Sequence, residues 1–202
     1  MPLYDLRESN EKISTVRKYI VPSRIVDGKD VDNEKVLLCD STSQTAIGTT
    51  DTAHLHENGY VLLDFGSEIH GGICLNIASV FNHKQQGSYD KSYGKARLVF
   101  GESVSEAMST VGDENGALND HAFRDMTVDV CTLSTRIFGN TGFRFVKIQA
   151  VDCEFKIKSA KAVLEYRDLE YKGSFRCDDD MLNKVFDTAA YTVHLNMQNY
   201  IW

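Results

Sequence analysis

The feature of this sequence that most restricts its fold is a strand-and-turn pattern that continues for most of its 202 residues. From Val16 to about Glu165, short runs of β-branched and aromatic residues alternate with clusters of Gly, Asn, Asp and Ser. In Phe143–Ile148 and Phe155–Lys158, apolar and polar side chains fall largely on opposite faces, as in a sheet with one buried face. The predicted strands are Val16–Val26, Val36–Cys39, Tyr60–Phe65, Gly72–Phe81, Ala96–Phe100, Met126–Leu133, Phe143–Val151 and Phe155–Tyr166.

No helical period interrupts these strands. The expected fold class is therefore mainly β, a two-sheet antiparallel β-sandwich of the jelly-roll or concanavalin-like kind, covering residues 1–170. Two polar stretches, Asn82 to Lys95 and Ser103 to Arg124, are expected to be long loops. Long loops on a sandwich often carry the function.

The period becomes helical after Gly173, so residues 171–202 are predicted to contain one C-terminal amphipathic helix. Asp178, Asp179 and Asp180 mark its start, because carboxylates cap free amides and favour the positive end of the helix dipole. No stop signal precedes Trp202, and we expect this helix to be the first of a truncated helical catalytic domain. An isolated amphipathic helix is marginal in water, so docking on the sheet or a homodimer through residues 178–202 is predicted.

Composition limits the expected partners and compartment. There are 22 Lys and Arg against 29 Asp and Glu, without a basic patch, so no nucleic-acid partner is expected. The five cysteines are scattered and odd in number, and we expect buried thiols rather than disulfides. The polar start and the absence of a long apolar run predict a cytoplasmic protein that does not bind a membrane.

Two motifs resemble metal sites. His54-Leu55-His56 follows Gly48 as in the metal-binding strands of cupin barrels, but the acid expected next is replaced by Tyr60 or Val61. The aspartate triplet lacks the glycine and final glutamate of a calcium loop. We therefore expect surface histidines before a turn at Asn58-Gly59, a capped helix, no metal and no cofactor.

A complete catalytic set is not found. Leu63–Gly72 holds two carboxylates, His70 and three glycines, but these glycines are expected to bend the chain between two strands. Glu102 follows the strand Ala96–Phe100 and is expected to satisfy loop amides. A nucleophile elbow and a phosphate-binding loop are both absent. No catalytic residue is predicted.

One segment combines an aromatic ring, a guanidinium, an imidazole and carboxylates at the end of the second long loop. This mixture suits sugar hydroxyls or a partner domain, although a solvated loop has a similar composition. The candidate substrate-binding residues are Asn119, His121, Phe123, Arg124 and Asp125.

Four segments, in this order, resemble the β-sandwich module of bacterial α-L-rhamnosidases: Asp64–Gly72, Val99–Ser103, Thr127–Val130 and Gly139–Val146. Gly173–Cys177 together with Ala190–Gln198 resembles the beginning of their helical catalytic region. Each motif alone is weak, but their order and spacing make the combination fairly specific. The resemblance covers residues from about Tyr60 to Trp202.

The resemblance implies an inverting glycoside hydrolase that removes terminal α-L-rhamnose with an (α/α)6 catalytic barrel. Inversion requires an acid and a base carboxylate roughly 6.5–9.5 Å apart. In this family they follow the last motif, so none can be assigned to a residue of this chain. The implied role is a non-catalytic sandwich, inactive alone, that braces the C-terminal catalytic domain and shapes its sugar pocket.

Two other functions are kept open. The first is an autonomous carbohydrate-binding module for L-rhamnosides, with Tyr89, Tyr93 and Phe123 stacking on the sugar ring. The second is a protein-interaction domain that pairs through its exposed helix.

Overall fold

The computed structural model describes residues 15–40, 44–46, 48–82, 92–110 and 124–197. The chain divides into two compact units. One is Lys18–Leu164, and the other combines the segments Met1–Arg17 and Glu165–Trp202. The strands are β1 (Thr15–Ile20), β2 (Arg24–Asp32), β3 (Ala53–Phe81), β4 (Tyr93–Gly101), β5 (Asp125–Cys131), β6 (Ser134–Val151) and β7 (Glu154–Arg167). The mainly β, antiparallel fold with a helix near the C-terminus is therefore confirmed.

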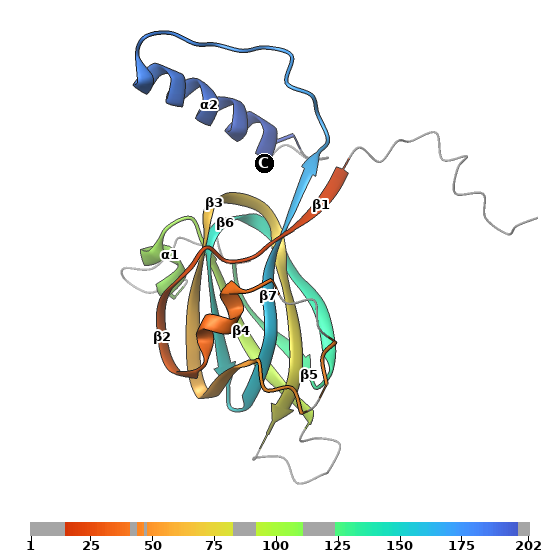
Figure 1. Ribbon diagram of the computed structural model, residues 1–202. Coiled ribbons are helices and arrows are strands. Elements are labelled where there is room, and N and C mark those ends of the chain that lie inside the picture. The colour runs from red at the N-terminus through yellow and green to blue at the C-terminus, as the bar shows by residue number, and fades with distance from the viewer. Residues whose placement is uncertain (1–14, 41–43, 47, 83–91, 111–123, 198–202) are drawn as a thin grey trace, which may run out of the picture. The chain divides into compact units, whose positions relative to one another are not determined.

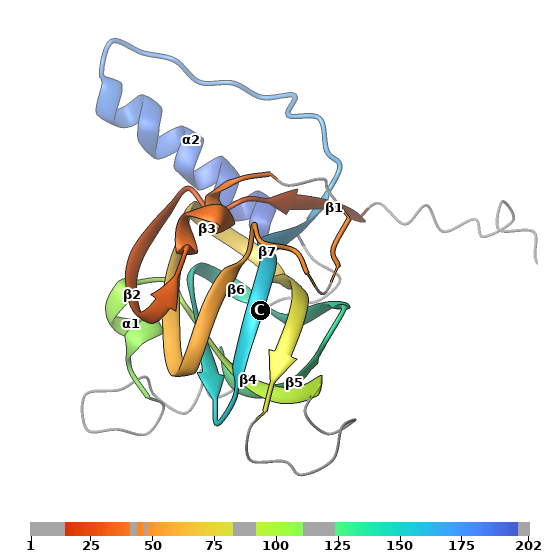
Figure 2. The same cartoon turned by 60° about the horizontal axis from the view of Figure 1, so that its bottom comes forward.

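Hydrogen bonds join the seven strands into one sheet, in the order β1-β7-β3-β6-β4-β5, with β2 also pairing with β3. The sheet curls on itself, as Figures 1 and 2 show for β2 to β7. Phe155 of β7 demonstrates the curl, because it is paired with both Leu55 and Val80 of β3. The two predicted sheets are thus parts of one continuous sheet.

The curl arises where β3 and β6 bend together. The ladder of β3 and β6 continues on both sides of Gly66–Gly71, with a register shift between Asp64 and Ile69. Gly66 and Gly139 have φ values of 87° and 80°, a region that side chains with a Cβ rarely adopt. The irregularity predicted at the glycines of Leu63–Gly72 is confirmed by the register shifts there, whereas the role of Gly139 was not predicted. The two strands expected on either side of these glycines form the single 29-residue strand β3.

The inward side chains of the curled sheet form the core. Phe143 is fully buried and makes edge contacts with Phe65 and Phe100, with ring centroids 5.9 and 5.1 Å apart. Leu55, Leu63, Ile73, Leu75, Ile77, Leu98, Val146, Ile148, Phe155 and Ile157 are buried in the same cluster. The strand residues that alternate in the sequence therefore enclose one apolar interior.

Some predicted elements differ from the structure. Val36–Cys39 was expected to be a strand, but Glu34–Leu38 forms a short 3-10 helix that buries only Leu37. It follows Asn33, whose φ of 56° turns the chain out of β2. The run Val16–Val26 is split into β1 and β2 around Pro22, which has no amide hydrogen to donate to a ladder.

The turn expected at Asn58-Gly59 is also absent, because β3 continues through these residues. Asn58 has a φ of 62°, and the pairing of β2 with β3 shifts register here, between Lys29 and Val31. A Cβ on Gly59 would lie 2.2 Å from the carbonyl oxygen of Asp30. The dipeptide therefore forms an irregularity within the strand, where two backbones approach closely.

The helix α2 (Asp180–Leu195) begins as predicted. The side chain of Asp179 accepts hydrogen bonds from the amides of Met181 and Leu182, at 2.8 and 3.3 Å. None of the described α2 residues is buried, and the exposed apolar side chains are Met181, Leu182, Val185, Phe186 and Val193. Docking on the sheet and dimerisation through α2 stay predictions. Among the described residues, no helix is long and apolar enough to cross a membrane.

The five cysteines are free thiols, as predicted, but their burial differs from the expectation. Cys153 is buried, whereas Cys39 and Cys177 are exposed. Cys39 follows the short 3-10 helix and Cys177 precedes α2, and both positions lie outside the ladders of the sheet. Cys74 and Cys131 are half-buried, so the prediction of buried thiols is confirmed only for Cys153.

Candidate functional site

The predicted sugar-binding segment is only partly described. Asn119, His121, Phe123 and the alternative stacking residue Tyr89 lie outside the described residues. Arg124 and Asp125 are described, and they interact with different partners. Asp125 begins β5 and accepts two hydrogen bonds from Arg97 of β4, at 2.8 and 2.5 Å.

Arg124 lies at the centre of a group of carboxylates, with only 11% of its side chain exposed. Its guanidinium donates to Glu102 and Glu106, each at 2.9 Å, and to the hydroxyl of Thr141 at 3.2 Å. The short helix α1 (Val104–Met108) holds Glu106, and Ser103 caps that helix by accepting from the Glu106 amide. This helix was not predicted, because it lies inside the polar segment expected to be a loop.

Glu68 joins this group from the bend of β3. A Cβ built on Gly142 would lie 3.1 Å from a carboxylate oxygen of Glu68 and 3.9 Å from Nη2 of Arg124, so the glycine leaves room for both. Burial raises the pKa of Glu68 to about 7, and the neighbouring Glu102 carboxylate adds to this rise, which Arg124 opposes. Glu68 is thus close to half protonated near neutral pH.

Asp64 is the opposite case on the same strand. Its carboxylate is buried and accepts from Arg144 at 2.8 and 3.0 Å, from Arg24 at 2.9 Å and from the Gly66 amide at 2.8 Å. The hydrogen bonds from Arg144, with those from Gly66 and Arg24, lower the pKa of Asp64 to about 2 despite its burial. We call the group Arg24, Asp64, Glu68, Glu102, Glu106, Arg124 and Arg144 the arginine cluster.

The arginine cluster is mostly satisfied by its own ion pairs. Arg24 and Arg144 keep 62% and 38% of their side chains exposed, so they retain donors for a ligand or a partner domain. Sequence reasoning found Arg124 from its residue type. It considered Glu68 and Glu102 separately, because Glu68 lies in β3 and Glu102 follows β4, and only the folded sheet brings them together.

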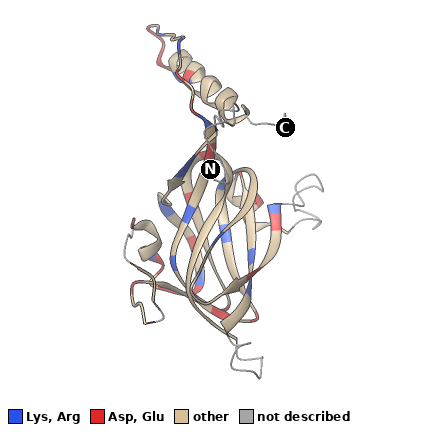
Figure 3. Ribbon diagram, turned by 90° about the vertical axis from the view of Figure 1, so that its right-hand side faces the viewer, with Lys and Arg blue, Asp and Glu red and all other residues tan. Residues whose placement is uncertain are grey.

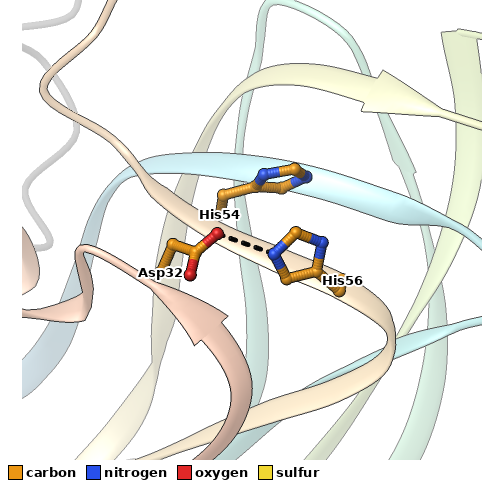
Figure 4. A group of neighbouring side chains, drawn as sticks. All are labelled: Asp32, His54 and His56. Atoms are coloured by element: carbon orange, nitrogen blue, oxygen red, sulfur yellow. Dashed lines mark hydrogen bonds and ion pairs between the residues drawn. The ribbon is translucent and has the colours of Figure 1, made fainter.

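A second polar group, which we call the histidine cluster, lies near the start of β3 and consists of Asp32, His54, His56 and Glu154. Figure 4 shows the first three of these residues. His54 bonds to Glu154 at 3.0 Å, and His56 bonds to Asp32 at 2.7 Å. Burial, followed by the neighbouring His56, lowers the pKa of His54 below its usual value. The side chains are 23% and 40% exposed for His54 and His56, so the predicted surface position holds better for His56.

Charged side chains of both signs are interspersed along the strands of the Lys18–Leu164 unit (Figure 3). The lysines and arginines are not separated from the acidic residues on this view. The expectation that nucleic acid is not a partner stays a prediction.

Comparison with known proteins finds rhamnosidases that are similar to this chain. No protein-family model matches the chain. An α-L-rhamnosidase of Formosa agariphila is 28% identical over 141 residues, which are 67% of this chain and 14% of that protein. A rhamnosidase of Klebsiella oxytoca, solved with rhamnose bound, aligns with a TM-score of 0.62 and 17% identity over 91% of this chain.

A GH78 rhamnosidase of Bacillus sp. GL1 aligns more distantly, with a TM-score of 0.47 and 15% identity over 76% of this chain and 15% of its own. The chain spans only 36% of the Klebsiella oxytoca protein and a smaller part of the other two. The chain is therefore similar to an α-L-rhamnosidase in sequence and to part of a rhamnosidase in fold, which confirms the resemblance predicted from its motifs.

Proposed function

We propose that this chain supplies the non-catalytic N-terminal β domain of an α-L-rhamnosidase-like glycoside hydrolase. In this role the domain braces a helical catalytic domain and shapes the rim of its sugar pocket. The observation that carries the proposal is the extent of the match: two thirds of the chain corresponds to only 14% of the Formosa agariphila protein. The rest of such an enzyme is large enough to contain a separate catalytic domain.

The arginine cluster supports a non-catalytic role. Inverting hydrolysis needs a protonated acid and a free base carboxylate that face each other across space for water. Glu102 and Glu106 are bound to Arg124, and the Asp64 carboxylate is bound to Arg24 and Arg144. Carboxylates that are bound to arginine in this way are poor proton acceptors, so they suit a structural role better than that of a catalytic base.

The exposed apolar face of α2 supports a helical partner. Met181 and Val185, four residues apart on α2, are 66% and 56% exposed, although large apolar side chains are usually covered in a stable protein. A helical catalytic domain that continues from this region would cover them.

The proposal is tested by assaying the purified 202-residue protein with an aryl α-L-rhamnoside. We expect no turnover above the uncatalysed rate. Glu68→Gln is the decisive variant, because among the described residues Glu68 is the carboxyl group whose pKa is raised to about 7. Turnover that this substitution abolishes would overturn the proposal and assign catalysis to the arginine cluster.

A carbohydrate-binding module remains the second candidate, because Tyr93 is 56% exposed and offers a ring for stacking. Calorimetry with L-rhamnose separates the two functions. A bracing domain gives no heat of binding, whereas binding that Tyr93→Ala abolishes would favour the module. Light scattering on the same samples tests pairing through α2, which would give a dimer that dissociates on dilution.

A further inference from the structure

We propose that Asp32, His54, His56 and Glu154 bind a Zn²⁺ ion where β2 ends, β3 begins and β7 begins. Asp32 is the last residue of β2 and is paired with His54 in the ladder. His54 and His56 are two residues apart on β3, so their side chains emerge on the same face. Glu154 is the first residue of β7.

The ligand atoms of the histidine cluster are already close together. One ligand atom each from Asp32, His54 and His56 lies within 4.8 Å of the others. Glu154 adds a carboxylate oxygen 3.0 Å from Nε2 of His54 and 3.8 Å from Nδ1 of His56. A tetrahedral ion with bonds of about 2.0–2.1 Å separates its ligand atoms by about 3.3 Å. Small rotations therefore suffice, and Asp32 is free to make them because its side chain is 71% exposed.

The charges of the cluster also suit a divalent ion. Two neutral imidazoles and two carboxylates carry two negative charges, which Zn²⁺ would neutralise. Lys156 is the neighbouring cation, but its ammonium lies over the Phe81 ring, 5.8 Å from the centroid. Imidazole nitrogens favour zinc and related transition metals, whereas calcium and magnesium prefer sites made of oxygen atoms.

The site would link three strands that are distant in the sequence. Asp32 and Glu154 come from β2 and β7, and both histidines come from β3. The bound ion would act as a structural clamp and requires no assumption about rhamnoside chemistry. The inference is therefore independent of the proposed function.

The experiment is a calorimetric titration of the chelator-treated 202-residue protein with Zn²⁺. We expect one ion per chain, a higher melting temperature that EDTA reverses, and no comparable response to Ca²⁺. His54→Gln and His56→Asn should each weaken binding by about tenfold or more. Asp32→Asn serves as a further variant that leaves the core intact, because the side chain is largely exposed.

His194→Gln is the matched control, because His194 bonds to Tyr171 and the Arg167 carbonyl instead. Its affinity for Zn²⁺ should equal that of the unchanged protein. Co²⁺ in place of Zn²⁺ distinguishes the histidine cluster from the exposed thiols Cys39 and Cys177. Zinc binding that survives both His54→Gln and His56→Asn, or a thiolate charge-transfer band with Co²⁺, would overturn the proposal.

Discussion

The arginine cluster and the histidine cluster both gather side chains from strands that are distant in the sequence, but they balance charge differently. In the first, permanently charged guanidinium groups hold carboxylates such as Asp64 and Glu106. In the second, imidazoles face Asp32 and Glu154, and an imidazole is mostly neutral above its pKa. The first cluster therefore carries most of its own counterions, whereas the second gains most from an added cation.

The largest expected effect is that of Asp64→Asn, which removes the buried anion between Arg24 and Arg144. Because the folded pKa is about 2 against an ordinary value of 3.8, the stabilisation is complete above about pH 4. It is lost as the pH falls from there through 2. We expect the variant to lose about 2 kcal/mol of unfolding free energy at pH 7, measured by urea denaturation.

The control for Asp64→Asn is Asp129→Asn, which breaks the exposed pair with Lys95. Solvent screens this pair, so its loss should be clearly smaller. Equal losses in the two variants would show that the arginine cluster is no more important for stability than a surface ion pair.

An effect of opposite sign is expected for Glu68→Gln. The folded protein keeps a proton on Glu68 up to about pH 7, whereas the unfolded chain releases it near 4.5. The unchanged protein therefore loses stability as the pH rises from 4.5 to 7, and the variant lacks this loss. The full pKa difference corresponds to about 3 kcal/mol, but Glu68 is only half-buried and solvent screens its charge. We therefore expect a gain of about 1 kcal/mol at pH 8 and almost none at pH 4.5.

Urea denaturation at pH 8 and pH 4.5 tests this prediction. Asp129→Asn is the comparison variant, because Lys95 lowers the pKa of the Asp129 carboxyl group, so its removal should give no such gain. A gain from Glu68→Gln that is the same at both pH values would contradict the raised pKa.

The smallest effect is expected for His56→Asn in the absence of metal. The side chain is 40% exposed, so the change in unfolding free energy should stay within about 0.5 kcal/mol. A melting curve recorded in EDTA measures it. A loss as large as that of Asp64→Asn would show that the histidine cluster stabilises the fold without metal as strongly as the arginine cluster does. The contrast between the two clusters would then disappear.

Periodicity was enough to predict most of the strands and the position of α2. It could not show that β3 continues through Gly66–Gly71, because that continuity depends on pairing with β6. The prediction of a strand at Val36–Cys39 was wrong, because a run of four apolar residues is compatible with a strand and with one helical turn. Local sequence therefore indicated the class of fold, and the curl required tertiary contacts.

The candidate sites show the same division. Arg124 was found because its segment combines residue types that suit sugar hydroxyls, but its carboxylate partners could not be inferred without the register of the strands. The histidines lacked the expected acid further along β3. The structure supplies acids from Asp32 on β2 and Glu154 on β7 instead. A sequence motif cannot include ligands that are 22 residues before His54 and 100 residues after it.

The length of β3 also has a consequence for folding during synthesis. β2 precedes β3 in the chain, but the other two hydrogen-bonding partners of β3, which are β6 and β7, begin at Ser134 and Glu154, long after β3 ends at Phe81. Contacts between such distant residues form slowly, and a ribosome makes about 5–20 residues per second. The apolar side chains of the second half of β3, which pairs with β6 and β7, therefore stay uncovered for several seconds, and chaperones have access to them during that delay.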